Sequence, residues 1–217
     1  MKETIIRIQD DGKIIVEEHN GCILRVKHIE PDALVKCINS STLRGKTASG
    51  LLPKNCISFT AYDNGTRDVC IVHTDDKADI SYHDTIYADF PLPRLVFGFT
   101  IGKEGRIQGC RIGIVADDLV LKPSSPMLLY PFSNVDGFQL CTGNNAMPKC
   151  ESLHQLSGLP YFILSMSNNN DYFQPRNNKQ GLEMRDLLEH LKDKPPAYYY
   201  KEVLLPMKKS LQDFITI

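Results

Sequence analysis

The sequence lacks a charge imbalance and a long apolar run. Lysine and arginine total 25 against 26 aspartate and glutamate residues, so the basic excess that drives binding to phosphate backbones is missing. No stretch approaches the roughly 18 apolar residues of a membrane helix. The start, Met1-Lys2-Glu3-Thr4, leads into a strand pattern rather than a secretory apolar segment. We therefore expect a cytoplasmic protein that binds neither nucleic acid nor a membrane.

Closely spaced cysteine pairs are also missing. The seven cysteines are an odd number, and the chain is long enough to build a core without disulfides. The sequence therefore predicts reduced thiols. Five lie in apolar or strand-like runs typical of small buried side chains: Cys22, Cys37, Cys56, Cys70 and Cys110. Only Cys141 and Cys150 lie in loop-like surroundings.

Common cofactor and hydrolase motifs are absent as well. No glycine loop that could cradle phosphates and no G-x-S-x-G turn occurs. Cys150 and His154 would share one face of a helix and, with Cys141, could ligate zinc. A closed zinc site normally needs a fourth ligand, and no second C-x-x-C or H-x-x-H pair supplies it. We expect neither a metal nor a cofactor.

What is present is an α+β pattern, with strands first and helices last. Turn signals at Asp10-Asp11-Gly12, Asp63-Asn64-Gly65 and Gly102–Gly105 predict hairpins. Pro91-Leu92-Pro93 indicates an edge or a crossing segment. The predicted strands are residues 4–8, 13–17, 22–27, 56–61, 67–73, 95–101, 106–115 and 127–130. The predicted helices are a short one from Pro31, then 151–167 with a kink or late start, 181–192, and 199–214 broken at Pro206.

Residues 131–148 form a long connection with little periodicity, and such connections inside compact domains are often functional. It contains the run Tyr130-Pro131-Phe132-Ser133-Asn134-Val135-Asp136-Gly137-Phe138-Gln139-Leu140-Cys141-Thr142-Gly143-Asn144. This run resembles the active-site stretch of ubiquitin-conjugating enzymes, in which a His-Pro-Asn element precedes a glycine and the catalytic cysteine. With Ser49–Pro53 and Pro91–Phe97, it looks like the prokaryotic branch that includes PRTRC system protein B.

The resemblance covers about residues 50–190 and is densest at 126–144. It implies a ubiquitin-conjugating-enzyme-like (UBC-like) fold over residues 49–217: an antiparallel meander, an active-site loop and C-terminal helices. Residues 1–48 would be a β-rich N-terminal extension with a short helix. The histidine of the family element is absent, and Asn134 lies seven residues before Cys141.

The resemblance further implies that Cys141 accepts a ubiquitin-like protein from a ThiF-like activating enzyme as a thioester and passes it to an amine. Asn134 would stabilise the oxyanion, although an Asx turn is an equal alternative. Asp136 and Asp171 are candidates for orienting the amine, but a turn is the first explanation of Asp136 and a solvated loop explains Asp171 better. A JAB-type metallopeptidase is a further implied partner, in a bacterial system for plasmid maintenance or phage defence.

Two alternatives stay open. The chain could be a non-catalytic UBC-like module that only binds a partner, as in relatives that have lost the cysteine. A neighbouring hydroxyl, Ser133 or Thr142, could instead carry the acyl group as an oxyester. Gly137 and Gly143 are expected to serve backbone geometry through positive φ angles in either case.

Overall fold

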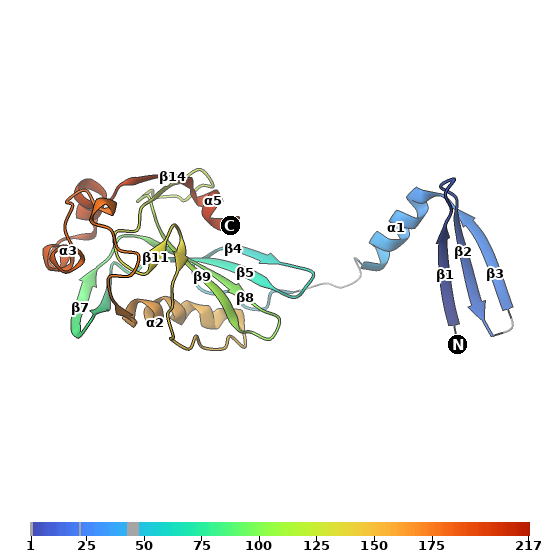
Figure 1. Ribbon diagram of the computed structural model, residues 1–217, viewed down its shortest axis with the longest axis horizontal. Coiled ribbons are helices and arrows are strands. Elements are labelled where there is room, and N and C mark those ends of the chain that lie inside the picture. Colours follow the sequence, from blue (N-terminus) through green and yellow to red (C-terminus); the bar gives the residue numbers. More distant parts are fainter. Residues whose placement is uncertain (1, 22, 43–47) are drawn as a thin grey trace. The chain divides into compact units, whose positions relative to one another are not determined.

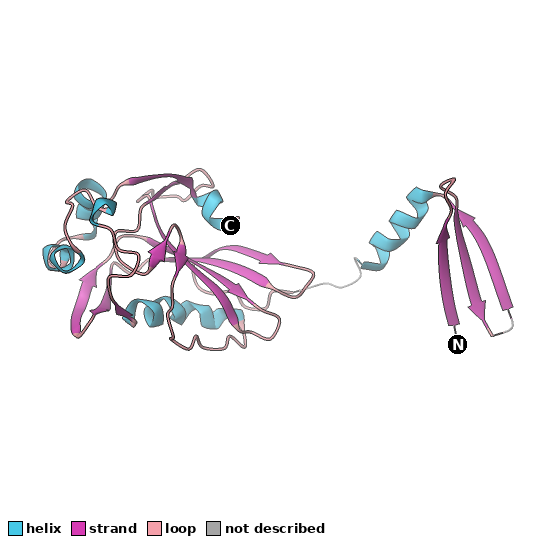
Figure 2. Ribbon diagram, viewed as in Figure 1, coloured by secondary structure: helices cyan, strands magenta, loops and turns pink. Residues whose placement is uncertain are grey.

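The computed structural model describes residues 2–21, 23–42 and 48–217. The chain divides into two compact units, Met1–Ala48 and Ser49–Ile217, which are described separately below. Figures 1 and 2 show the elements of each unit. Together they make a mixed α+β protein with mostly antiparallel sheets and few helices.

The first unit is a three-stranded antiparallel meander followed by a helix. Its elements are β1 (Lys2–Ile8), β2 (Ile14–Asn20), β3 (Ile23–Ile29) and α1 (Pro31–Thr42). Ile8 pairs with Ile14 across the first turn, and Ile14 pairs in turn with Ile29. The predicted hairpin, third strand and helix are confirmed. Cys22, the predicted first residue of the third strand, lies outside the described residues.

The second unit is built on an antiparallel sheet whose central path runs β11-β12-β9-β8-β5-β4. Its four long strands are β4 (Cys56–Ala61), β5 (Arg67–His73), β8 (Leu95–Ile101) and β9 (Ile107–Val115). The sequence predicts all four to within one residue, because each alternates or runs apolar between clear turn signals. In Figure 1 they fan out as the cyan and green arrows.

Two hairpins of this sheet close with the same three-residue turn. In the first, Tyr62 N–H donates to the Thr66 carbonyl oxygen and Gly65 N–H to that of Tyr62, each at 2.9 Å. In the second, Gly102 and Gly105 make the equivalent bonds at 2.9 and 2.8 Å. The last turn residue has a φ of +84° at Gly65 and +81° at Gly105, a conformation that favours glycine.

A second sheet was not predicted. β6 (Lys77–Tyr82) and β7 (Thr85–Pro91) pair antiparallel, and β13 (Ser167–Asn168) joins β6 in parallel. Pro91 ends β7, the edge strand of this sheet, which agrees with the expected edge position. β6 does alternate, with Ala78, Ile80 and Tyr82 facing the core, but the strand is short and only Ile80 and Tyr82 are buried.

The predicted helix 151–167 is two elements. A 3₁₀ helix, η1 (Leu153–Gly158), leads into α2 (Leu159–Ser165), with the join where Gly158 and Pro160 predicted a break. The helix predicted at 181–192 is α3 (Met184–Leu191), preceded by the short η2 (Pro175–Asn177).

The predicted helix 199–214, broken at Pro206, is helical at both ends and wrong in its middle. The chain forms α4 (Pro196–Tyr198), a π-helical turn η3 (Tyr199–Val203), the strand β14 (Pro206–Ser210) and α5 (Leu211–Ile215). Pro206 begins a strand because β14 pairs with β10 (Pro126–Leu128), which in turn pairs with β9. This pairing is a tertiary effect that local periodicity does not encode.

Both faces of the main sheet are covered. One core cluster joins the sheet to α2, α3 and η3 through side chains such as Phe97, Ile163, Leu187 and Tyr199. The other places Phe214 of α5 against Phe138, with ring centroids 5.0 Å apart. Among the described residues, no helix is long and apolar enough to cross a membrane.

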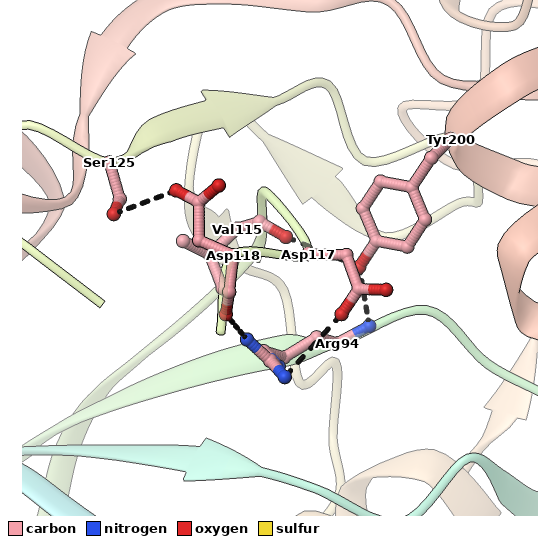
Figure 3. A network of polar contacts seen from close by, with 6 residues as sticks. All are labelled: Arg94, Val115, Asp117, Asp118, Ser125 and Tyr200. Atoms are coloured by element: carbon pink, nitrogen blue, oxygen red, sulfur yellow. Dashed lines mark hydrogen bonds and ion pairs between the residues drawn. The ribbon is translucent and has the colours of Figure 1, made fainter. Parts of the chain in front are cut away.

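A polar network fastens η3 to the main sheet (Figure 3). The Tyr200 hydroxyl accepts from Arg94 N–H at 2.9 Å and donates to the Val115 carbonyl oxygen at 3.2 Å. The Arg94 guanidinium donates to the Asp118 carbonyl oxygen at 2.5 Å and lies 3.4 Å from the Asp117 carboxylate. Burial raises the pKa of Tyr200 to about 12, so its hydroxyl stays protonated and able to donate.

Candidate active site

The segment before Cys141 is a small hairpin. β11 (Val135–Asp136) and β12 (Gln139–Leu140) pair through Val135 with Leu140 and Asp136 with Gln139. Gly137 opens its two-residue turn with a φ of +61°, as expected, which suits a type II′ turn. Gln139 also pairs with Arg111 of β9, so the hairpin extends the main sheet.

This hairpin brings Asn134 and Cys141 together although seven residues separate them. Cys141 N–H donates to the Asn134 carbonyl oxygen at 2.8 Å, one step beyond the last strand pair. Both residues line the same cavity of about 30 Å³, with apolar side chains from β9, α2 and α3 among its other walls. Cys141 itself is exposed. Cys141 and Asn134 therefore share the wall of one small, largely apolar cavity.

Asn134 is fixed by its backbone and by its side chain. Its φ is +63°, a left-handed conformation that asparagine tolerates better than most residues. Its N–H donates to the Asp171 carbonyl oxygen at 2.7 Å, and its Nδ2 donates to Asn168 Oδ1 at 3.3 Å. The side chain therefore contacts a distant segment, whereas an Asx turn would have used the neighbouring backbone.

The two predicted acidic residues differ in their relation to the cysteine. Asp171 contacts Asn134 through its carbonyl oxygen, while its carboxylate accepts from Asn169 Nδ2 at 2.8 Å. Asp136 is exposed on the hairpin, and no contact recorded within the described ranges joins it to Cys141 or Asn134. The structure thus brings together Cys141, Asn134 and the backbone of Asp171. Amine orientation by either carboxylate stays a prediction.

Beyond Cys141 the chain is irregular until Cys150. Gly143 has the expected positive φ, +55°, and Asn145 N–H donates to the Thr142 carbonyl oxygen at 3.1 Å. At the far end, Cys150 N–H donates to the Gly105 carbonyl oxygen at 2.8 Å. The loop is therefore attached to the β8-β9 hairpin turn where it ends.

Two cysteines differ in exposure from what their sequence surroundings suggested. Cys150 lies in a loop but is buried, with its thiol donating to the Ser152 carbonyl oxygen at 3.1 Å, whereas Cys37 is exposed. Burial raises the pKa of Cys70 to about 11 and that of Cys110 to about 12, so both are poor nucleophiles at neutral pH. Cys141 is an exposed thiol in the second unit, which sets it apart from these buried cysteines.

The structure also bears on the two other chemistries that the sequence left open, a zinc site and an oxyester on Ser133 or Thr142. Cys150 precedes η1 and does not share a helix face with His154, whose Nδ1 lies 2.8 Å from Ser152 Oγ. Within the ranges that the structure describes, no three His, Cys, Asp or Glu side chains are placed to hold a metal ion. The Ser133 hydroxyl is buried, with 1% of the residue exposed, and donates to Asn168 Oδ1 at 3.3 Å. An oxyester on Ser133 would require this bond to break.

The comparisons with known proteins give no family. No family model, no curated protein and no solved structure matches this chain. The UBC-like fold and function therefore stay predictions from the residues around Cys141.

Sequence reasoning missed Asn168 as a member of this site. The run Asn168-Asn169-Asn170 begins three residues after the end of α2, and each of its side chains makes a defined contact. Asn168 Oδ1 accepts from Asn134 and Ser133. Asn169 Oδ1 accepts from Asp171 N–H, and Asn170 Oδ1 accepts from Tyr82 Oη at 2.8 Å. Three consecutive asparagines after an apolar helix were the available signal, because this residue type commonly binds backbone and amide groups in turns.

Proposed function

We propose that the second unit is a ubiquitin-conjugating-enzyme-like carrier that holds a ubiquitin-like protein as a thioester on Cys141. The observation that supports this best is the exposed Cys141 thiol beside Asn134, both at one cavity and joined by a backbone hydrogen bond. An isolated exposed cysteine would carry little weight. An exposed cysteine with a fixed amide beside it is what acyl transfer through a thioester needs.

The reaction consists of two acyl transfers. The Cys141 thiolate attacks the carbonyl carbon of a ubiquitin-like C-terminus held as a thioester on an activating enzyme, and the thiolate of that enzyme leaves. An amine, commonly of a lysine, then attacks the new thioester, loses a proton to solvent, and the Cys141 thiolate leaves. No net oxidation occurs, and ATP is consumed only by the activating enzyme.

Each transfer passes through a tetrahedral oxyanion, for which Asn134 Nδ2 is the candidate donor. The two Nδ2 hydrogens allow one bond to Asn168 and a second to a reacting oxygen. A single donor of this kind contributes roughly 3–4 kcal/mol in other acyl-transfer enzymes. Asn134→Ala is therefore expected to slow transfer by two to three orders of magnitude.

This proposal carries partners with it. A ThiF-like activating enzyme must supply the thioester, a ubiquitin-like protein is the cargo, and a JAB-type metallopeptidase is expected to remove that cargo from targets. The branch resembled is that of PRTRC system protein B, in bacterial plasmid maintenance or phage defence. The cytoplasm, where thiols stay reduced, suits this chemistry.

The test is intact-mass analysis of the purified chain after mixing with its activating enzyme, ubiquitin-like protein and ATP. The native chain is expected to gain the mass of the cargo minus water, in a form that dithiothreitol removes. Cys141→Ser is expected to give an adduct that resists dithiothreitol and yields to hydroxide. Cys141→Ala is expected to give none.

Two further variants serve as controls. Cys56→Ala removes a half-buried thiol from the edge strand β4 and is expected to load like the native chain. Thr142→Ala tests the remaining candidate hydroxyl. If this variant no longer forms the adduct although Cys141 is intact, an oxyester on Thr142 is favoured. Absence of any adduct on the native chain would favour a non-catalytic binding module.

A further inference from the structure

Asn168 occupies a fixed backbone position next to the proposed site. It ends β13, where it pairs in parallel with Tyr82 of β6, and its carbonyl oxygen accepts from His83 N–H at 2.9 Å. It lies three residues after Ser165, the last residue of α2, so a helix close by in the chain and a sheet both restrict it. A side chain on such a support is held more narrowly than one on a free loop.

Two backbone acceptors determine which way its amide points. Asn168 Nδ2 donates to the Ser81 carbonyl oxygen at 2.9 Å and to the Met166 carbonyl oxygen at 3.3 Å. A carbonyl oxygen can only accept, so the nitrogen must face both of these groups. The Oδ1 atom consequently faces the opposite way, toward Ser133 and Asn134.

That oxygen accepts from two neighbouring residues. Ser133 Oγ and Asn134 Nδ2 each lie 3.3 Å from Asn168 Oδ1. Because Oδ1 is an acceptor, Asn134 must present nitrogen rather than oxygen to it. All three of Asn134, Cys141 and Asn168 line one cavity. The chain Ser81–Asn168–Asn134 therefore transmits the orientation of a backbone carbonyl to the amide beside the cysteine.

We propose that Asn168 is a positioning residue, which holds the Asn134 amide with its nitrogen available to the Cys141 reaction. An asparagine amide rotates broadly about χ2 when nothing fixes it, so an unheld Asn134 would often present oxygen to the developing oxyanion. Preorganised donors give the largest electrostatic stabilisation in acyl transfer. The kinetic consequence rests on the proposed thioester function, whereas the orientation of Asn134 does not.

The kinetic test is a double-mutant cycle on the second transfer. Chains loaded with the ubiquitin-like protein are mixed with free lysine, and loss of the thioester is followed in a single turnover. Asn134→Ala is expected to slow this step roughly 100-fold and Asn168→Ala about 10-fold. In the Asn134→Ala background, Asn168→Ala is expected to add less than about 2-fold, because both changes remove one interaction.

A fully multiplicative loss in the double variant would overturn the proposal, since Asn168 would then act independently of Asn134. Asn145→Ala is the matched control. Asn145 is an exposed asparagine of the same loop whose side chain binds only the Thr142 carbonyl oxygen among its recorded contacts, and its loss should change the rate less than 2-fold. Melting temperatures identify any variant that fails to fold, and Asn168→Ser replaces Asn168→Ala in that case.

A second measurement does not require the reaction. The side-chain NH₂ signals of Asn134 in a ¹⁵N–¹H spectrum are identified by their disappearance in Asn134→Ala. In Asn168→Ala the hydrogen-bonded proton is expected to shift upfield and exchange faster, and in Asn145→Ala both signals should stay unchanged. Unchanged Asn134 signals in Asn168→Ala overturn the positioning role even if thioester forms. Shifted signals without any thioester on the native chain support the positioning role and reject the proposed function.

Discussion

Gly105→Ala is expected to destabilise the second unit more than Gly65→Ala, although both glycines end the same type of turn. Their φ angles are +81° and +84°, so an alanine at either position costs about 1–2 kcal/mol of left-handed strain. The three atoms nearest to a Cβ on Gly65 would be Lys103 side-chain carbons, at 3.1–3.3 Å. That side chain is exposed and can move.

At Gly105 the added atom meets backbone instead. The Cβ would lie 2.3 Å from the Cys150 carbonyl oxygen, so the loop that starts after Cys141 must shift. Overpacking costs about 1–3 kcal/mol, and the 2.8 Å bond from Cys150 N–H to Gly105 is worth about 1 kcal/mol. Gly105→Ala should therefore lose about 2 kcal/mol more than Gly65→Ala, or roughly 4–8 °C in melting temperature.

Urea unfolding followed by circular dichroism measures this difference directly. Hydrogen exchange adds a local readout, because the Cys150 amide should lose protection in Gly105→Ala and keep it in Gly65→Ala. Equal stability losses in the two variants, with the Cys150 amide protected in both, would refute the attachment of the loop to Gly105.

Three further predictions concern Tyr200, His73 and Cys141. Tyr200→Phe leaves Arg94 N–H without its hydroxyl partner and should cost about 1–3 kcal/mol in urea unfolding; a loss below about 0.3 kcal/mol would contradict the network of Figure 3. Burial lowers the pKa of His73, so the unfolded state takes up the proton first as the pH falls through about 6.5. The free energy of unfolding should therefore decrease below that pH. His73→Phe should lose less of this free energy between pH 7 and 5. Iodoacetamide should label exposed Cys141 at least about 10-fold faster than buried Cys110 at pH 7.5, as read by peptide mass mapping.

The long strands could be predicted from the sequence because each carries its own signal. In β5 the apolar residues run without interruption from Val69 to Val72, and in β8 only Thr100 is polar, so neither strand needs its neighbours to be recognised. In β14 the opposite holds. β14 contains Pro206 and two lysines, and it is a strand only because β10 lies beside it. Pairing partners of this kind are fixed by tertiary structure and are invisible to local patterns.

The candidate site divides in the same way. The loop, its cysteine and the nearby asparagine are continuous in sequence, and the Asp-Gly pair predicts the turn that brings Asn134 back to Cys141. Asn168 is 34 residues from Asn134 and 87 from Ser81, so its role depends on contacts that only the folded chain creates. The sequence therefore predicted the cysteine and the asparagine of the site, but it did not predict that Asn168 holds Asn134.

The attachment of the Cys141 loop at both ends has a consequence for how its length can vary. Gln139 pairs with Arg111 just before the loop, and Cys150 binds Gly105 where the loop ends, so strand β9 and its turn carry both attachments. Residues 142–149 can therefore lengthen without altering the register of any strand. Doubling the length of a flexible loop costs only about 0.6 kcal/mol of closure entropy. Insertions at this position can diversify the surface beside the thiol at almost no cost to folding.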